Sequence, residues 1–467
     1  MRIAVHSLHH AALDRRTKGM MMASKEKRDF SRRSLLKGAG AAMAVVAAAT
    51  GKVDAAERPP RRLTTAPPLG WNSFDSYRGR EDEKSMLDNL ELFSKKLKPH
   101  GYEYFVIDGG WFRQDGSEYL DGYGRYLPAP AKFPNGFKPL VARAHDLGIK
   151  FGLWMVRGIP IQAVSKDLTI KGTPYRASSI ANKEDVSTWY KGNYGVDTTK
   201  PGAQEYYTSL VELLASWEID FIKWDDIVPH PDEIEAAANA VDACKQPIVL
   251  SLSPGDHVKL SDVPAYRRAD MVRITGDVWD NRKDLEKAFE RWELLQDYGG
   301  DGFWLDLDMI PFGDLANRGN ASQPFRKDNF TPEQKRSFMA QRALAASPLF
   351  MGGNLPTSDE FSIGLVTHPG MLACNQNGVV GKLVRRTPPI EVWKTPNKTR
   401  KNQGWLGIFN RSTERASVVL RSLDLGLDKG GSWRFEDVWR GVRLAEGLGS
   451  RLDLAPDGSA FLRYELD

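Results

Sequence analysis

Cysteine is scarce in this chain of 467 residues, which contains only Cys244 and Cys374. Two cysteines cannot build the disulfide framework that holds small secreted domains together. No cysteine or histidine stands at a spacing that zinc ligands require, so the sequence predicts no metal centre of that kind and no cofactor. We therefore expect both cysteines to be buried thiols.

Two further absences narrow the chemistry. No histidine ends any of the apolar runs that we predict to be strands, which argues against a Ser-His-Asp site. No glycine-rich phosphate loop follows the first predicted strand, which argues against an open nucleotide-binding sheet. A magnesium site built from carboxylates alone stays open, and with it the alternative of a metal-dependent hydrolase.

The net charge of +5 comes from the N-terminus. Residues 1–56 hold eleven Lys and Arg against four Asp and Glu. Removing this surplus of seven from the total leaves −2 for the rest of the chain. A chain so close to neutral gives no reason to expect nucleic acid or an acidic membrane surface as a partner.

The basic N-terminal segment has the features of an export signal. Ser31-Arg32-Arg33-Ser34-Leu35-Leu36-Lys37 is a twin-arginine pattern, a small apolar run follows from Gly38 to Thr50, and Val53-Asp54-Ala55 provides small residues at the cleavage spacing. We predict a signal peptide over 1–56, read by the twin-arginine export machinery, and a linker over 57–66. The mature protein would be periplasmic or secreted. It would keep no membrane anchor, because the run is too short to span a bilayer. The alternative is an uncleaved amphipathic segment.

Residues 67–380 alternate between apolar runs and helical patterns. Such alternation is typical of a parallel sheet, and eight repeats predict a closed (β/α)8 TIM barrel, with an open doubly wound sheet as the alternative. The eight predicted strands are 69–74, 104–108, 150–156, 221–226, 247–252, 271–275, 302–308 and 348–351. The predicted helices include 83–98, 137–147, 203–217, 283–297 and one that begins with the capping residues Thr331, Pro332 and Gln334.

Two regions depart from this alternation. After Gly381 short alternating segments separated by turn residues predict an antiparallel β-sandwich over 381–467. Carbohydrate binding and packing against the barrel are both open as its role, and we expect packing. Residues 157–200 form a long polar segment with several aromatic residues, and loops of this length are often functional lids.

Charged side chains follow most of the predicted strands. In a (β/α)8 barrel the C-terminal ends of the strands meet at one rim, where catalytic groups project. Carboxylates and cations at that rim, together with the thirteen Trp of the chain, favour a sugar as the ligand. The residues placed at or near the rim are Asp108, Arg157, Lys223, Asp225, Asp226, Arg273, Asp277, Asp306 and Asp308.

Hydrolysis of a glycosidic bond needs two carboxyl groups in opposite roles. Lys223 lies two residues before Asp225 on the same strand face, and its charge would keep Asp225 ionised as a nucleophile. Asp277 precedes the apolar Val278 and Trp279, and we expect apolar surroundings to keep its proton in place. Each Asp taken alone is also compatible with a structural role at a strand end.

Six motifs follow one another along the chain. They are Pro67-Pro68-Leu69-Gly70-Trp71-Asn72-Ser73, Ile107-Asp108, Phe221-Ile222-Lys223-Trp224-Asp225, Arg273-Ile274-Thr275-Gly276-Asp277, Trp304-Leu305-Asp306-Leu307-Asp308-Met309 and Ser347-Pro348-Leu349-Phe350-Met351. Taken in this order, they resemble the α-galactosidase (melibiase) family, glycoside hydrolase family 27. The resemblance covers roughly residues 66–380, and the C-terminal β-domain fits it as well.

The resemblance implies a retaining exo-glycosidase that acts on an oligosaccharide or glycoside, most simply an α-galactosidase. Asp225 falls at the family's nucleophile and Asp277 at its acid/base. The expected substrate-binding residues are Asp108, Trp154, Lys223, Arg273, Trp71 and Asp308.

The chain also departs from the family pattern. Gly109 replaces a second Asp, Phe74 replaces a Trp beside the sugar, and two bracketing Cys are absent. Ser253-Pro254-Gly255 is small where members that recognise the sugar 2-hydroxyl have bulky groups. The catalytic pair is therefore better supported than galactose itself. A β-L-arabinopyranoside, an N-acetylated galactoside, an α-glucan end and a non-catalytic carbohydrate-binding protein remain alternatives.

Overall fold

The computed structural model describes residues 63–187, 189–317 and 322–467. The predicted signal peptide, 1–56, and the linker up to residue 62 lie outside the described residues. Within the described ranges no helix is both long and apolar enough to cross a membrane.

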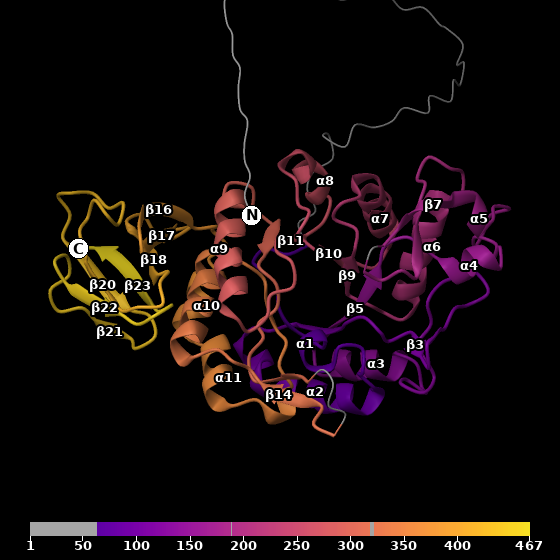
Figure 1. Ribbon diagram of the computed structural model, residues 1–467, viewed down its shortest axis with the longest axis horizontal. Coiled ribbons are helices and arrows are strands. Elements are labelled where there is room, and N and C mark those ends of the chain that lie inside the picture. Colours follow the sequence, from indigo (N-terminus) through magenta and orange to yellow (C-terminus); the bar gives the residue numbers. More distant parts are fainter. Residues whose placement is uncertain (1–62, 188, 318–321) are drawn as a thin grey trace, which may run out of the picture. The chain divides into compact units, whose positions relative to one another are not determined.

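Eight parallel strands form one sheet in which neighbours in the chain are neighbours in space. The first strand pairs with the last, and the chain that follows the seventh strand meets the last strand at a parallel bridge between Ile310 and Met351. The predicted (β/α)8 TIM barrel is confirmed. Its strands are β1 (Leu69–Asn72), β2 (Tyr104–Ile107), β5 (Lys150–Val156), β9 (Phe221–Asp225), β10 (Val249–Leu252), β11 (Met271–Arg273), β12 (Trp304–Asp306) and β15 (Leu349–Met351). Figure 1 labels β5, β9, β10 and β11 of this sheet.

Several of the helices between the strands begin at a side chain that caps them. Asp82 and Thr331 each form a capping box, and each such cap stabilises a helix by about 1 kcal/mol. The helix over 231–243 has no counterpart among the helices predicted above, because alanines form much of its buried face and give a weak apolar stripe. The barrel helices are α1 (Phe74–Tyr77), α2 (Glu83–Lys96), α3 (Lys138–Asp146), α6 (Ala203–Ser216), α7 (Pro231–Ala243), α8 (Val263–Tyr266), α9 (Arg282–Leu295), α10 (Pro332–Leu344), α11 (Glu360–Val366) and α12 (Pro369–Asn375).

The segment 157–200 is a small folded module. Its three strands form an antiparallel sheet with β8 (Asn193–Val196) in the middle. A two-stranded hairpin, β3 (Arg113–Gln114) with β4 (Ser117–Glu118), follows β2, and a second one, β13 (Asp314–Ala316) with β14 (Phe325–Lys327), follows β12. The elements of the module are β6 (Ile159–Pro160), α4 (Ile161–Ser165), α5 (Ala177–Ile180), β7 (Ala181–Val186) and β8 (Asn193–Val196).

The C-terminal part is antiparallel, as predicted. A six-stranded sheet and a two-stranded one enclose an apolar cluster that includes Leu406, Phe435 and Leu462. In sheet order the large sheet contains β16 (Lys382–Thr387), β17 (Ile390–Pro396), β18 (Gln403–Asn410), β23 (Ser459–Leu466), β20 (Trp433–Asp437) and β21 (Val442–Arg443), and the small one contains β19 (Ala416–Val419) and β22 (Arg451–Leu454). The domain limits 67–380 and 381–467 stay a prediction.

The β-domain packs on barrel helices α9 and α10. Trp393 stacks on Trp292 with ring centroids 3.7 Å apart, and Phe409 meets Phe289 edge-on at 4.8 Å. Burying a large apolar side chain contributes about 1.5–3 kcal/mol, so this interface stabilises the barrel substantially. The packing role that we expected for the β-domain is therefore supported.

Both cysteines are free. Cys374 is buried in α12, whereas Cys244 at the end of α7 is partly exposed, so the prediction of a buried thiol holds only for Cys374.

Candidate active site

A cleft of about 1050 Å³ lies at the C-terminal ends of the barrel strands. Its lining comes from the ends of β5 and β9, from the loops after β1, β2, β10 and β11, and from the 157–200 module after β5. This is the rim at which we expected the functional groups. Of the predicted residues, the cleft brings together Asp108, Trp154, Lys223, Asp225, Arg273 and Asp277.

Asp225, the last residue of β9, is held by three hydrogen-bond donors. The Nε1–H of Trp154 donates to one carboxylate oxygen at 3.0 Å. The hydroxyl of Ser253 and the backbone N–H of Asp226 donate to the other at 2.9 and 3.0 Å. These donors come from two neighbouring strand ends and from the next residue, so the carboxylate has a fixed orientation in the cleft.

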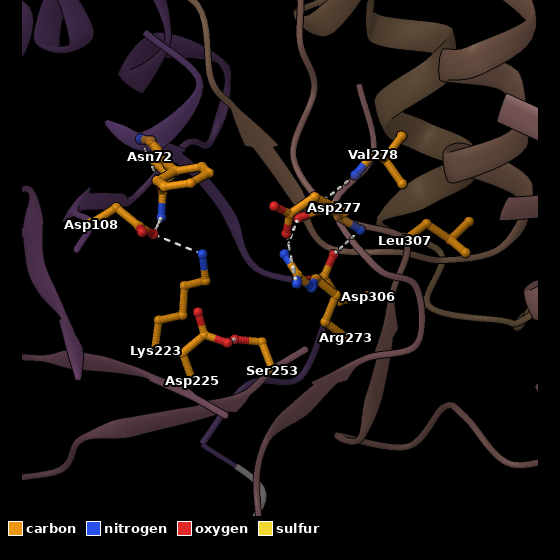
Figure 2. A network of polar contacts seen from close by, with 12 residues as sticks. Asn72, Asp108, Lys223, Asp225, Ser253, Arg273, Asp277, Val278, Asp306 and Leu307 are labelled. Atoms are coloured by element: carbon orange, nitrogen blue, oxygen red, sulfur yellow. Dashed lines mark hydrogen bonds and ion pairs between the residues drawn. The ribbon is translucent and has the colours of Figure 1, made fainter. Parts of the chain in front are cut away.

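Lys223 contacts Asp108 rather than Asp225 (Figure 2). Its Nζ donates to Asp108 Oδ2 at 2.7 Å, and the side-chain amide of Asn72 donates to the same oxygen at 2.8 Å. Burial alone would lower the pKa of Lys223, but the negative charges of Asp108 and Asp225 outweigh this effect and raise it. The cleft therefore contains a charged ammonium group aligned with a carboxylate.

Arg273 links two carboxylates, of which Asp277 is labelled in Figure 2. It donates at 3.0 Å both to Asp277 and to Asp308. Burial opposes the charge of Arg273, but Asp308 and Asp277 outweigh it and raise the pKa of the guanidinium group. Asp308 also accepts the backbone N–H of Val278 at 2.7 Å, which fixes the start of the loop that carries Asp277.

Comparison with known proteins places the chain among glycosidases. The Melibiase family model matches residues 82–246. The crystal structure of a variant of a GH27 β-L-arabinopyranosidase from Geobacillus stearothermophilus, in complex with arabinose, is 35% identical and superposes with a TM-score of 0.81, covering 86% of this chain and 97% of that one.

The chain belongs to glycoside hydrolase family 27. The α-galactosidase of Cyamopsis tetragonoloba is 26% identical to this family 27 chain over 384 residues, which cover 81% of this chain and 80% of that protein. The α-N-acetylgalactosaminidase of Rattus norvegicus is 25% identical over 417 residues, covering 81% and 85%. The protein is thus a glycoside hydrolase, as the order of its motifs predicted.

The structure corrects the prediction for three residues of this family 27 enzyme. Trp71 is fully buried; its indole N–H donates to the Gly353 carbonyl at 2.8 Å, and its ring stacks on Phe105. Asp308 is buried outside the cleft lining and positions Arg273. The side chain of Asp277 is 53% exposed beside Arg273, so the apolar surroundings that we expected are absent. Polarity after a strand is visible in a sequence, but exposure is not.

Sequence reasoning missed two side chains that hold the site together. Asn72 ends β1 and orients Asp108, and Ser253 follows β10 and orients Asp225. Both stand at strand ends, as the predicted residues do. Neither is charged, so neither has the residue type that marks an acid/base group in a sequence.

Arg157, which the sequence also placed at the rim, belongs to a separate buried network. Its guanidinium group donates to Asp185 and Glu233 at 2.7 Å and to Asp226 at 3.4 Å. Among the described residues one group, Asp185 with His230 and Glu233, has potential metal-ligand atoms within 4.8 Å of one another. Because Arg157 already provides the positive charge at this place, we assign no metal ion to it.

Proposed function

We propose that this family 27 hydrolase is a retaining exo-glycosidase that removes a terminal sugar of the galactose configuration. The observation that carries the proposal is the cleft in which Asp225 and Asp277 stand with three further charged groups for sugar hydroxyls, Asp108, Lys223 and Arg273. Trp154 and Phe74 add aromatic faces to the same lining, which suit the apolar side of a pyranose ring.

The proposed reaction has two steps. In the first, Asp225 attacks the anomeric carbon, the bond to the leaving oxygen breaks, and Asp277 gives its proton to that oxygen. In the second, water attacks the same carbon, its proton passes to Asp277, and the ester bond to Asp225 breaks. Two inversions at one carbon retain the configuration of the sugar.

The surroundings of the two carboxyl groups suit these roles. Asp225 must approach one carbon along a defined line, and its three donors provide that orientation. Asp277 must exchange a proton with the leaving group and then with water. Its exposed side chain can be reached by a leaving group and by water from the cleft.

We propose two sugars as candidates for this site. An α-galactoside is the simplest proposal from the family motifs. A β-L-arabinopyranoside, which has the same ring without the 6-carbon, is favoured by Gly109. A Cβ atom added there would lie 3.2 Å from the Trp154 ring, so the indole occupies the space that a second carboxylate would need. The similarity to the GH27 β-L-arabinopyranosidase supports the same choice.

The test is hydrolysis of nitrophenyl glycosides by the mature protein and by Asp225→Ala. The panel contains the α-galactoside, the β-L-arabinopyranoside, the N-acetyl-α-galactosaminide and the α-glucoside. We expect cleavage of one of the first two, a loss of roughly 10³-fold or more in Asp225→Ala, and partial rescue of that variant by azide with formation of a glycosyl azide. Undiminished cleavage by Asp225→Ala would refute the assignment.

Export is part of the proposal and rests on the twin-arginine pattern alone. We propose that residues 1–56 direct the folded chain to the periplasm or the medium. Fractionation of cells that express the full chain, or its Arg32→Lys/Arg33→Lys variant, tests this directly. Processed protein outside the cytoplasm only for the unchanged chain is the expected result.

A further inference from the structure

Trp189 is a large aromatic side chain that stays 51% exposed. It belongs to the inserted module 157–200 and lines the cleft next to Trp154, Lys223 and Asp225. The two-step reaction assigns it no task. An exposed indole at the mouth of a sugar-binding cleft provides a flat apolar face for a ligand.

Hydrogen bonds fix this exposed ring relative to the proposed nucleophile. The Nε1–H of Trp189 donates to Asp226 Oδ1 at 3.2 Å, and Asp226 Oδ2 pairs with Arg157 at 3.4 Å. The backbone N–H of Asp226 donates in turn to Asp225. The position of the indole is therefore determined by the residue that follows Asp225 in the chain.

Trp189 continues a row of aromatic rings that starts at the catalytic carboxylate. Trp154 contacts Asp225 directly, and the Trp154 and Trp189 ring centroids are 6.2 Å apart with an interplanar angle of 64°. Trp154 thus borders the space of the sugar that is attacked. Trp189 is the next ring along the row and lines the same cleft as Asp277, the proposed proton donor to the leaving group.

A hairpin from another loop fixes the same wall. The hydroxyl of Tyr190 donates to Glu118 at 2.6 Å, and the guanidinium of Arg113 pairs with Glu118 at 3.1 Å and lies 4.6 Å from the centroid of the Tyr190 ring. Arg113 and the hairpin turn at Gln114 and Asp115 also line the cleft. This wall combines an aromatic face with polar groups, the combination that a pyranose ring requires.

The cleft has room for such a second ring. Its volume of about 1050 Å³ is at the upper end of the roughly 300–1000 Å³ range in which pockets hold drug-sized ligands. One terminal pyranose would leave much of it empty.

We propose that Trp189 is the stacking platform for a leaving-group sugar, and that the substrate is an oligosaccharide or a glycan side chain rather than a small aryl or alkyl glycoside. The proposal rests on the proposed exo-glycosidase function and names the substrate class of that site. Trp189 acts in it as a specificity residue that binds the leaving group.

The test compares two substrates with the same sugar and different leaving groups. α-Galactosyl fluoride loses an ion that cannot stack, whereas melibiose loses a glucose ring. The β-L-arabinopyranosyl fluoride and a matching disaccharide replace this pair if the nitrophenyl panel identifies that sugar. For Trp189→Ala we expect kcat/KM to fall roughly 5- to 10-fold on the disaccharide and to stay within twofold on the fluoride.

Two further variants separate stacking from a structural role. Trp189→Phe keeps a ring but loses the N–H bond to Asp226, and we expect it to retain most of the disaccharide activity. Tyr175→Ala removes a 39% exposed aromatic residue of the same module that is not part of the cleft lining, and both substrates should react as before. If kcat/KM of Trp189→Ala falls equally on both substrates, or falls on neither, Trp189 is not a stacking platform for the leaving group.

Failure of the proposed function gives a different result. A wild-type protein that cleaves neither substrate contradicts the exo-glycosidase assignment. The platform is then decided by calorimetric titration of melibiose into the wild type and Trp189→Ala. Weaker binding by the variant supports it, and equal affinity or no binding by either protein overturns it.

Discussion

The two catalytic carboxyl groups that we propose lie in contrasting parts of one cleft. Asp225 ends a strand and accepts three hydrogen bonds, whereas Asp277 follows a strand, is 53% exposed, and contacts one arginine. A nucleophile attacks one atom along one direction, so a fixed orientation serves it. A general acid that later becomes a base must meet both a leaving group and water. The contrast indicates that a firmly hydrogen-bonded carboxylate suits a nucleophile, whereas an exposed carboxyl group suits a general acid/base.

The largest loss of activity is expected when the exposed carboxyl group of Asp277 is removed. Asp277→Ala should lose on the order of 10²–10⁴-fold in kcat/KM on glycosides with poor leaving groups. It should lose far less on a dinitrophenyl glycoside, whose leaving group needs no proton. Steady-state kinetics on the two substrates measure the difference. If the loss is the same on both, Asp277 does not donate the proton.

A smaller effect is expected on the Asp225 side. Ser253→Ala removes one of the three donors and leaves Trp154 and the Asp226 N–H in place. We expect a fall in kcat of about 10-fold, since a hydrogen bond to a charged group contributes about 1.5–3 kcal/mol. Ser261→Ala, at an exposed serine outside the cleft lining, is a matched control that should change nothing. A kcat unchanged in Ser253→Ala would show that the third donor is dispensable.

On the same side of the site as Asp277, Asp306 is buried below Arg273. We expect Asp306 to make the stability of the protein depend on pH. Burial, and secondly the charge of Asp308, raise the pKa of Asp306 from an ordinary 3.8 to about 7. Between about pH 4 and 7 the unfolded chain therefore binds fewer protons at this group than the folded one, and the free energy of unfolding falls as the pH rises through this window.

Asp306→Asn removes this dependence, because an amide does not titrate. Above pH 7 the variant should be more stable than the wild type by on the order of 1–4 kcal/mol, and at pH 4 the advantage should vanish. Denaturant titrations of both proteins from pH 4 to 8 measure it. Parallel stability curves for the two proteins would contradict the shift.

The smallest expected effect on catalysis concerns Trp71. Trp71→Phe leaves a cavity and an unpaired Gly353 carbonyl, and should destabilise the fold by about 2 kcal/mol. Because Trp71 lies in the core below the cleft, kcat/KM of the folded enzyme should change less than twofold. A rise in KM for Trp71→Phe, with kcat unchanged, would instead indicate that Trp71 contributes to sugar binding, as the sequence suggested.

The comparison also shows what a sequence can predict. The eight strands, the capping box at Thr331 and the charged residues after β2, β9 and β11 follow from local patterns of apolar, capping and charged residues. The pairing of Lys223 with Asp108 depends on which strand ends become neighbours across the barrel, so spacing along one strand suggested Asp225 instead. The exposure of Asp277 and the burial of Trp71 likewise depend on packing that no local pattern encodes.

The stack of Trp393 on Trp292 has a practical consequence for anyone who shortens the chain. A protein that ended near residue 380 would retain every catalytic group proposed here, yet it would present Phe289 and Trp292 to water along α9. Such a bare aromatic surface invites association between copies, so the shortened enzyme should form insoluble aggregates even though its chemistry is complete. We therefore expect the β-domain to keep the barrel soluble, although the proposed catalytic groups all belong to the barrel.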